Sequence, residues 1–281
     1  MSLASSPAGL LARLLFVAVL ALGAAPASAA VSDWTAGAKA RVRLIAAGIG
    51  EDGRLAAGIE IRLPPGWKTY WRTPGDAGIA PTIDLGASRN FEAPDVRFPV
   101  PHRFDDGYAV TNVYSERVLL PVSAVVPDPT RSVFLVLRIE LGVCEVICIP
   151  DRVDARLIVP PREDDPVAAG LLADAAADLP GPPEPGVLAV DDVTHDGGTD
   201  KRPVFRFAVT VDDPQEAVVF VEGPDDWRPA VPRFAGETVL GAFYTVQFRR
   251  LAAHTPIDQA AFRVTIVSGD RAVEQTIGLD D

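Results

Sequence analysis

Short runs rich in Val, Ile, Leu and Phe alternate with turns rich in Pro, Gly and Asp along most of the chain. This rhythm is typical of β-sandwiches. Within one run, Leu137, Ile139 and Leu141 alternate with Arg138 and Glu140, which is the pattern of a strand with one buried face. Up to residue 160 the pattern predicts strands at Ala40–Ile49, Arg54–Leu63, Pro81–Leu85, Val96–Phe98, Val118–Val126, Val133–Leu141 and Arg152–Val159.

Residues 160–186 break this rhythm. Asp165 and Pro166 precede an Ala/Leu run, Val167–Leu179, which predicts a short helix, and the proline cluster 180–186 predicts a stiff, extended linker. A second set of strands is then expected at Val187–Val193, Val204–Val211, Ala217–Val221, Val239–Phe248, Phe262–Val267 and Val273–Leu279. The chain is therefore predicted to be all-β, with one sandwich domain at 31–160, a linker with a short helix at 161–186, and a second sandwich domain at 187–281.

The first 29 residues have the pattern of a secretory signal peptide. Arg13 precedes the apolar run Leu14–Leu22, and Ala27-Ser28-Ala29 forms an A-x-A cleavage site. A membrane anchor is the alternative, but the uninterrupted run is shorter than the ~20 residues of a spanning helix. We expect cleavage and export to a bacterial periplasm, with no membrane span in the remaining chain. The only methionine, Met1, leaves with the signal, which argues against a copper carrier built on thioethers.

Composition narrows the range of partners and cofactors. The 281 residues include 26 Lys and Arg against 38 Asp and Glu, for a net charge of −12. An acidic chain without a basic block is a poor ligand for nucleic acid or for an anionic membrane, so no nucleic-acid partner is expected. Two cysteines cannot build a disulfide-dense scaffold or a four-thiolate zinc site, and no phosphate-binding glycine loop is present. We expect no cofactor.

The two cysteines, Cys144 and Cys148, lie between two predicted strands, where the chain must turn back. Four extended residues span about 13 Å, whereas a disulfide needs Cα atoms roughly 4.4–6.8 Å apart. A bond between them therefore requires a compact turn or a single helical turn at this hairpin. A structural staple closing so small a loop stabilises by only about 2 kcal/mol, while closely spaced pairs suit reversible dithiol chemistry. Spacing alone leaves both interpretations open.

Neighbouring residues bear on the reactivity of the pair. Glu145 and Asp151 flank it and Arg152 is the nearest cation in the sequence, so no strongly activated thiolate is expected. A zinc site would need ligands from elsewhere, and His102, His195 and His254 are widely scattered. Serine-protease-like catalysis lacks a G-x-S-x-G motif.

Three segments in order resemble the amino-terminal periplasmic domain of the thiol:disulfide interchange protein DsbD and the corresponding region of suppressor-of-copper-sensitivity protein B. They are Gly66–Arg72 with its continuation to Thr82, Tyr114–Val122, and Gly142–Pro150. The resemblance covers residues 38–160. It implies an immunoglobulin-like sandwich that relays reducing equivalents, so that the fold expected for the whole chain is two immunoglobulin-like β-sandwich domains.

Carried onto this sequence, the resemblance makes Cys148 the cysteine that forms a mixed disulfide and Cys144 its resolving partner. The segment His102–Tyr114 matches a cap loop that shields the pair until a partner docks. Cap candidates and aromatic positions expected to line the site are Phe104, Asp105, Asp106, Tyr108, Tyr70 and Trp67. The bland alternatives are sandwich-core aromatics for Trp67 and Tyr70, and a solvated loop for Asp105-Asp106.

The resemblance also implies partners. We expect neither the membrane electron carrier nor the thioredoxin-like domain in these 281 residues, so a separate membrane-embedded electron donor would reduce the pair. A periplasmic thioredoxin-like protein would be the acceptor. The alternative function is a non-catalytic immunoglobulin-like binding or assembly module that keeps a structural disulfide.

Overall fold

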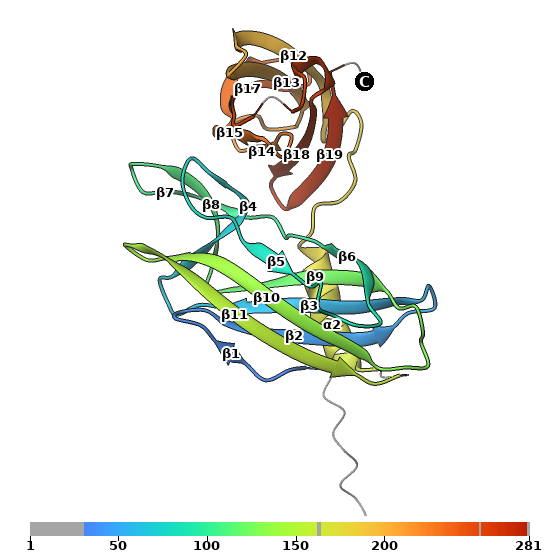
Figure 1. Ribbon diagram of the computed structural model, residues 1–281. Helices are drawn as coiled ribbons and strands as arrows, with labels where there is room; N and C mark the ends of the chain where they lie inside the picture. Colours follow the sequence, from blue (N-terminus) through green and yellow to red (C-terminus); the bar gives the residue numbers. More distant parts are fainter. Residues whose placement is uncertain (1–30, 162–163, 253, 280–281) are drawn as a thin grey trace, which may run out of the picture.

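The structure is a computed structural model that describes residues 31–161, 164–252 and 254–279 (Figure 1). The predicted signal peptide, residues 1–29, lies outside these ranges. Strands dominate the described chain and confirm the prediction of an all-β fold. No helix in the described ranges combines the length and apolar character that crossing a membrane requires.

The first sandwich packs two sheets face to face. One has the order β1-β2-β3-β9-β6, and the other has the order β11-β10-β4-β8-β7 with β5 paired to β10. The bounds of the first sheet are β1 (Thr35–Ala36), β2 (Arg41–Ile49), β3 (Arg54–Arg62), β9 (Arg117–Val125) and β6 (Glu92–Val96). Those of the second are β11 (Cys148–Val159), β10 (Val133–Cys144), β4 (Lys68–Gly75), β8 (Val110–Ser115), β7 (His102–Asp105) and β5 (Thr82–Asp84).

Alternation of apolar side chains explains the strands that form this core. On β10 the apolar residues Leu135, Leu137, Ile139 and Leu141 are buried, while the intervening Glu140 is exposed. They pack against β2, β3 and β9 in one buried cluster, which also includes Phe220 of a later strand, β14 (Val218–Glu222). The core of the first sandwich therefore continues into the second half of the chain.

Helix α2 (Pro166–Ala177) belongs to the first sandwich rather than to a free linker. Asp165 caps its first turn by accepting hydrogen bonds from two backbone amides. Its buried residues, Ala168, Leu172 and Ala175, pack on the outer face of β2 and β9 against Ile45 and Leu119. The predicted helix is thus present, two residues shorter at its C-terminal end than expected.

The second half of the chain forms two further sheets, drawn at the top of Figure 1. One has the order β12-β13-β17-β15 with β16 paired to β17, and the other has the order β14-β18-β19. Their buried cluster is rich in aromatic rings, with Phe205 and Phe262 at 4.6 Å between centroids. The bounds are β12 (Ala189–Thr199), β13 (Arg202–Thr210), β14 (Val218–Glu222), β15 (Trp227–Pro229), β16 (Arg233–Glu237), β17 (Gly241–Arg250), η2 (Ile257–Gln259), β18 (Ala261–Ser268) and β19 (Arg271–Gly278).

Several boundaries differ from the sequence prediction. Strands β1, β4, β7, β8, β15 and β16 form in segments for which the sequence pattern predicts no strand. The strand expected at Val96–Phe98 is instead β6, which ends at Val96. The mispredicted segments are short or polar, so side-chain alternation carries little signal there.

Candidate functional site

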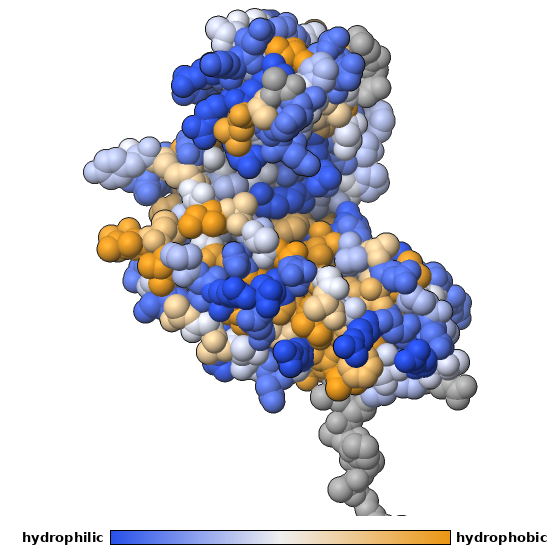
Figure 2. Space-filling model, viewed as in Figure 1, coloured by the Kyte–Doolittle hydropathy of each residue, from blue (hydrophilic) through white to orange (hydrophobic). Residues whose placement is uncertain are grey.

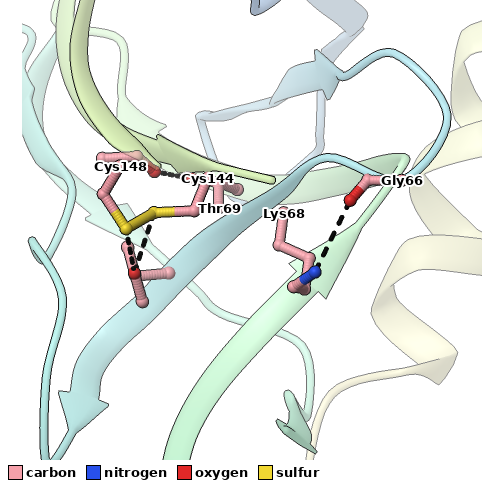
Figure 3. The surroundings of a disulfide bond; sticks show 7 residues. Gly66, Lys68, Thr69, Cys144 and Cys148 are labelled. Carbon is pink, nitrogen blue, oxygen red and sulfur yellow. Dashed lines mark hydrogen bonds between the residues drawn. A yellow bond between two sulfur atoms is a disulfide. The ribbon is translucent and has the colours of Figure 1, made fainter. Parts of the chain in front are cut away.

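The cysteines close the tip of the long β10–β11 hairpin. Cys144 is the last residue of β10 and Cys148 the first of β11, and the two are directly opposite in the antiparallel ladder. Only residues 145–147 form the turn, so the two Cα atoms lie 4.1 Å apart and a disulfide joins the sulfurs (Figure 3). The compact turn that the spacing required is present, and the hairpin provides it without a helical turn.

The two cysteines differ in exposure. Cys144 is 7% exposed and packs with Tyr70 and Val113, whereas Cys148 is an exposed residue at the start of β11. An incoming thiolate therefore has a route to Cys148, while Cys144 is screened by the sheet. This asymmetry is what a pair consisting of an attacking and a resolving thiol requires.

Tyr70 is the polar side chain that contacts the disulfide. Its hydroxyl lies 2.9 Å from Sγ of Cys144 and 3.0 Å from Sγ of Cys148. The ring is 6% exposed, and this burial, together with the charge of Asp106, raises the pKa of the phenol above its ordinary value. The hydroxyl is therefore protonated at neutral pH and can donate a hydrogen bond to either sulfur.

Two glycines make room for the Tyr70 ring. A β-carbon placed on Gly78 would lie 2.3 Å from Cε1 of the ring, and one on Gly142 would lie 3.0 Å from Cδ2. Gly78 also has φ +109°, a conformation that residues with side chains rarely adopt. The ring thus occupies a slot that only glycine leaves open.

Lys68 is the cation placed next to the pair by the sheet. It is opposite Cys144 in the β4–β10 ladder, although it is distant in the sequence. Its ammonium lies 3.5 Å from the carbonyl oxygen of Gly66 (Figure 3). It also lies 4.2 Å from the centre of the Phe104 ring. Arg152 is the nearest cation in the sequence, but its guanidinium forms long ion pairs with Glu140 at 3.8 Å and with Asp154 at 3.7 Å.

Asp151 follows the pair in the sequence, but its carboxylate serves another purpose. It is 4% exposed and accepts 2.7 Å hydrogen bonds from the backbone amides of Ala38, Lys39 and Ala40. The carboxylate therefore anchors the segment that leads into β2. Its charge is compensated by amide dipoles rather than facing the sulfurs.

The expected cap segment forms the β7–β8 hairpin. Phe104 packs beneath the Lys68 ammonium, close to the strand that faces Cys144. Asp105 and Asp106 build the turn by accepting hydrogen bonds from backbone amides at residues 107–109. Tyr108 is 98% exposed at the tip. The predicted cap is thus an ordered hairpin beside the site.

Trp67 is placed differently from Tyr70. Its ring lies 4.8 Å from the ammonium of Lys39 and packs against the sandwich core. Within the described residues, Tyr70 contacts both sulfurs, Lys68 is paired with Cys144 in the ladder, and Phe104 contacts the Lys68 ammonium, while Trp67 lies to one side. No cluster of three His, Cys, Asp or Glu suited to a metal ion occurs in that part of the chain.

Comparison with known proteins gives two matches. Residues 38–160 match the family model described as "Thiol:disulfide interchange protein DsbD, N-terminal". The fold resembles the crystal structure of the N-terminal periplasmic domain of ScsB from Proteus mirabilis, with a TM-score of 0.65, 22% sequence identity, and coverage of 89% of this chain and 98% of that one. No curated protein matches the chain. Residues 38–160 therefore belong to the DsbD N-terminal domain family, whose fold is an immunoglobulin-like sandwich.

Proposed function

We propose that the chain is a periplasmic thiol–disulfide exchange protein that carries two electrons on Cys144 and Cys148. The observation that supports this most directly is the asymmetric disulfide at the hairpin tip, with one exposed cysteine and one that is buried under a tyrosine hydroxyl. The match of residues 38–160 to the DsbD N-terminal family supports thiol–disulfide exchange as the chemistry of this cysteine pair.

In the proposed reaction, the reduced protein acts as the electron donor. The Cys148 thiolate attacks a disulfide sulfur of the partner, which forms a mixed disulfide and releases one partner thiolate. Cys144 then loses its proton and attacks Sγ of Cys148, which breaks the mixed disulfide and releases the second partner thiolate. The partner gains two electrons and, once its thiolates are protonated, two protons, and the Cys144–Cys148 disulfide is restored.

The surface around the tip suits a protein partner. Val146 and Ile147 in the turn are 93% and 73% exposed, and Ile79 nearby in the fold is 47% exposed. Figure 2 shows apolar colouring at the projecting end of the β10–β11 hairpin. Exposed apolar side chains gathered beside a reactive group are typical of a docking site.

The partners follow from the family. We propose that a separate membrane-embedded protein reduces the pair and that a periplasmic thioredoxin-like protein accepts the electrons. In this scheme the β7–β8 hairpin, with Phe104, Asp105, Asp106 and Tyr108, is the cap that shields the pair between encounters, and the structure, with Cys148 exposed, corresponds to the open arrangement. No bound cofactor is needed.

A trapping experiment tests the proposal. The Cys144→Ser variant lacks the resolving thiol, so it should form a stable disulfide with an oxidised thioredoxin-fold protein, visible as a dithiothreitol-sensitive band on a non-reducing gel. The matched Cys148→Ser variant keeps only the buried cysteine and should trap much less. Equal trapping by both variants would contradict the roles assigned to the two sulfurs.

Redox equilibrium separates this function from the alternative, a non-catalytic module with a structural disulfide. A relay pair should equilibrate with glutathione, whereas an inert staple should have a potential below about −300 mV and trap nothing. The hairpin is already paired over twelve residues of each strand, so a staple at its tip would add little to the register.

A further inference from the structure

The sheet β14–β18–β19 contacts β4, the strand that carries Tyr70, through a cluster of ion pairs. Arg72, two residues after Tyr70 on β4, donates hydrogen bonds to Glu222 at 2.9 and 2.7 Å and also pairs with Glu274. Thr73 donates its hydroxyl to Glu222 at 2.8 Å. The three charged side chains are only 15–22% exposed, so solvent screens the cluster weakly.

This contact occurs where β4 lacks support from its own sheet. Tyr70 is paired with Val113 of β8, and the next pair in the ladder is Gly75 with Thr111, so β4 contains extra residues between these points. Pro74 lies in that interval and has no backbone N–H to donate. The segment that follows Tyr70 is therefore held largely by its side chains. Among these, Arg72 makes the most hydrogen bonds.

The same sheet also holds the base of the β7–β8 hairpin. Arg103 on the edge strand β7 donates a 2.8 Å hydrogen bond to the carbonyl oxygen of Val219, and its guanidinium lies 5.0 Å from the centre of the Phe220 ring. Phe220 in turn contacts Trp71 of β4 at 5.4 Å between centroids. In Figure 1, β14 lies above β4, β7 and β8. One sheet thus contacts both β4, which pairs with β10 at Cys144, and β7 of the adjacent hairpin.

We propose that the β14–β18–β19 sheet positions Tyr70 against the disulfide, with Arg72, Glu222 and Glu274 as positioning residues for thiol–disulfide exchange. Tyr70 and Arg72 are two residues apart on β4, and the Arg72 guanidinium lies over the ring of Trp71 between them, 4.4 Å from the ring centre. Holding the guanidinium therefore restricts the backbone that carries the phenol. The proposal rests on the proposed function only in taking the disulfide as the reactive group. It assigns a task to the second half of the chain.

The test uses the full chain with both carboxylates neutralised, Glu222→Gln together with Glu274→Gln. Reduction of the disulfide by dithiothreitol is measured at neutral pH by acid quenching and alkylation. We expect reduction to slow by about twofold to fivefold, the size typical of remote positioning contacts. The slowing should not exceed that caused by Tyr70→Phe. An unchanged or faster rate overturns the proposal.

A double-mutant cycle tests whether the effect passes through Tyr70. In the Tyr70→Phe background the two glutamine substitutions should change the rate no further, whereas the same fold-change in both backgrounds overturns the proposal. Arg72→Lys keeps the charge but loses the forked geometry, so it should slow reduction in the same direction even if the double glutamine variant folds poorly. An Arg72→Lys rate equal to that of the wild type overturns the proposal.

A matched control removes an ion pair from the same sheet without touching β4. Glu184 pairs with Arg271 of β19, and Glu184→Gln should leave the rate unchanged. Equal slowing in this control overturns the proposal. Because the reductant is a small dithiol, the result is independent of the trapping experiment. Failure to trap a thioredoxin-fold protein would remove the assigned partner, whereas failure of the cycle would remove the positioning role alone.

Discussion

Replacing Tyr70 with Phe isolates the hydrogen bond between the phenol and the disulfide. The ring is kept, so the slot between Gly78 and Gly142 stays filled and only the oxygen that lies 2.9 Å from Sγ of Cys144 is lost. When an external thiolate attacks the exposed Cys148, the leaving sulfur is that of the buried Cys144, and negative charge develops there. A hydroxyl that donates to this sulfur stabilises the transition state.

The size of the effect follows from the charge on the sulfur. A hydrogen bond to a fully charged group contributes about 1.5–3 kcal/mol. With roughly half of a charge transferred at the transition state, consistent with a Brønsted coefficient of about 0.5, the loss is about 0.8–1.5 kcal/mol. Since about 1.4 kcal/mol corresponds to a factor of ten in rate, Tyr70→Phe should slow reduction by roughly fourfold to twelvefold.

The assay is the pseudo-first-order reduction of the oxidised protein by excess dithiothreitol, with acid quenching and alkylation of the released thiols. Tyr108→Phe is the matched control because this tyrosine is 98% exposed at the tip of the β7–β8 hairpin. Thermal unfolding of each variant establishes that the fold is intact. If Tyr70→Phe is reduced as fast as the wild type or faster, the hydroxyl shields the disulfide rather than assisting its cleavage, and the reasoning is refuted.

Three further substitutions test the surroundings. Gly78→Ala should displace the Tyr70 ring and slow reduction of the disulfide at least as much as Tyr70→Phe does. The control is Gly107→Ala, which shares a positive φ but has open space around it and should leave the rate of reduction unchanged. Equal rates in the two alanine variants would contradict the slot. Asp151→Ala removes a buried acceptor shared by three backbone amides and should lower the free energy of unfolding by about 2–4 kcal/mol. Urea denaturation measures this change, and an undiminished midpoint would count against the anchor. Burial would raise the pKa of Glu60, but hydrogen bonds from three arginines outweigh it and hold that pKa below its ordinary value. The carboxylate therefore stabilises the fold above the pKa that Glu60 has in the unfolded chain, and this effect is lost as the pH falls through the pKa of the folded protein. Glu60→Gln should lower the free energy of unfolding by about 2 kcal/mol at pH 7 and by progressively less in acid. Thermal unfolding at several pH values measures this difference.

Much of the fold could be predicted from the sequence because its long strands are strongly apolar. Strands β10 and β11 bury alternate residues over most of their length, whereas β2, β3 and β9 also contain consecutive buried residues, because α2 packs on their outer face. All five strands were predicted to within a few residues. The end of β10 differs from its prediction. The prediction ended it at Leu141, while the strand continues to Cys144 because the cysteines themselves are paired in the ladder.

The cysteines could be predicted as the reactive centre, but the side chains around them depend on long-range pairing. Lys68 faces Cys144 only because β4 joins β10 over two residue pairs, and nothing in the local sequence specifies that register. Asp151 shows the converse case. It is seven residues from Cys144 in the sequence, but its carboxylate accepts hydrogen bonds from backbone amides of another segment. Charge near the pair in sequence is therefore a poor guide to charge near the sulfurs.

A local signal for Tyr70 does exist, and it lies in the glycines. Gly78 and Gly142 come from different segments, yet both would collide with the same ring if they carried a β-carbon. A glycine beside the cysteine hairpin and another after a β-strand indicate that a bulky group must approach the backbone closely at that point. The Tyr70 ring is therefore held between the backbone at Gly78 and that at Gly142. The strand that carries it is interrupted in its ladder between Tyr70 and Gly75, and it is in this interval that Arg72 pairs with the carboxylates of the second half of the chain.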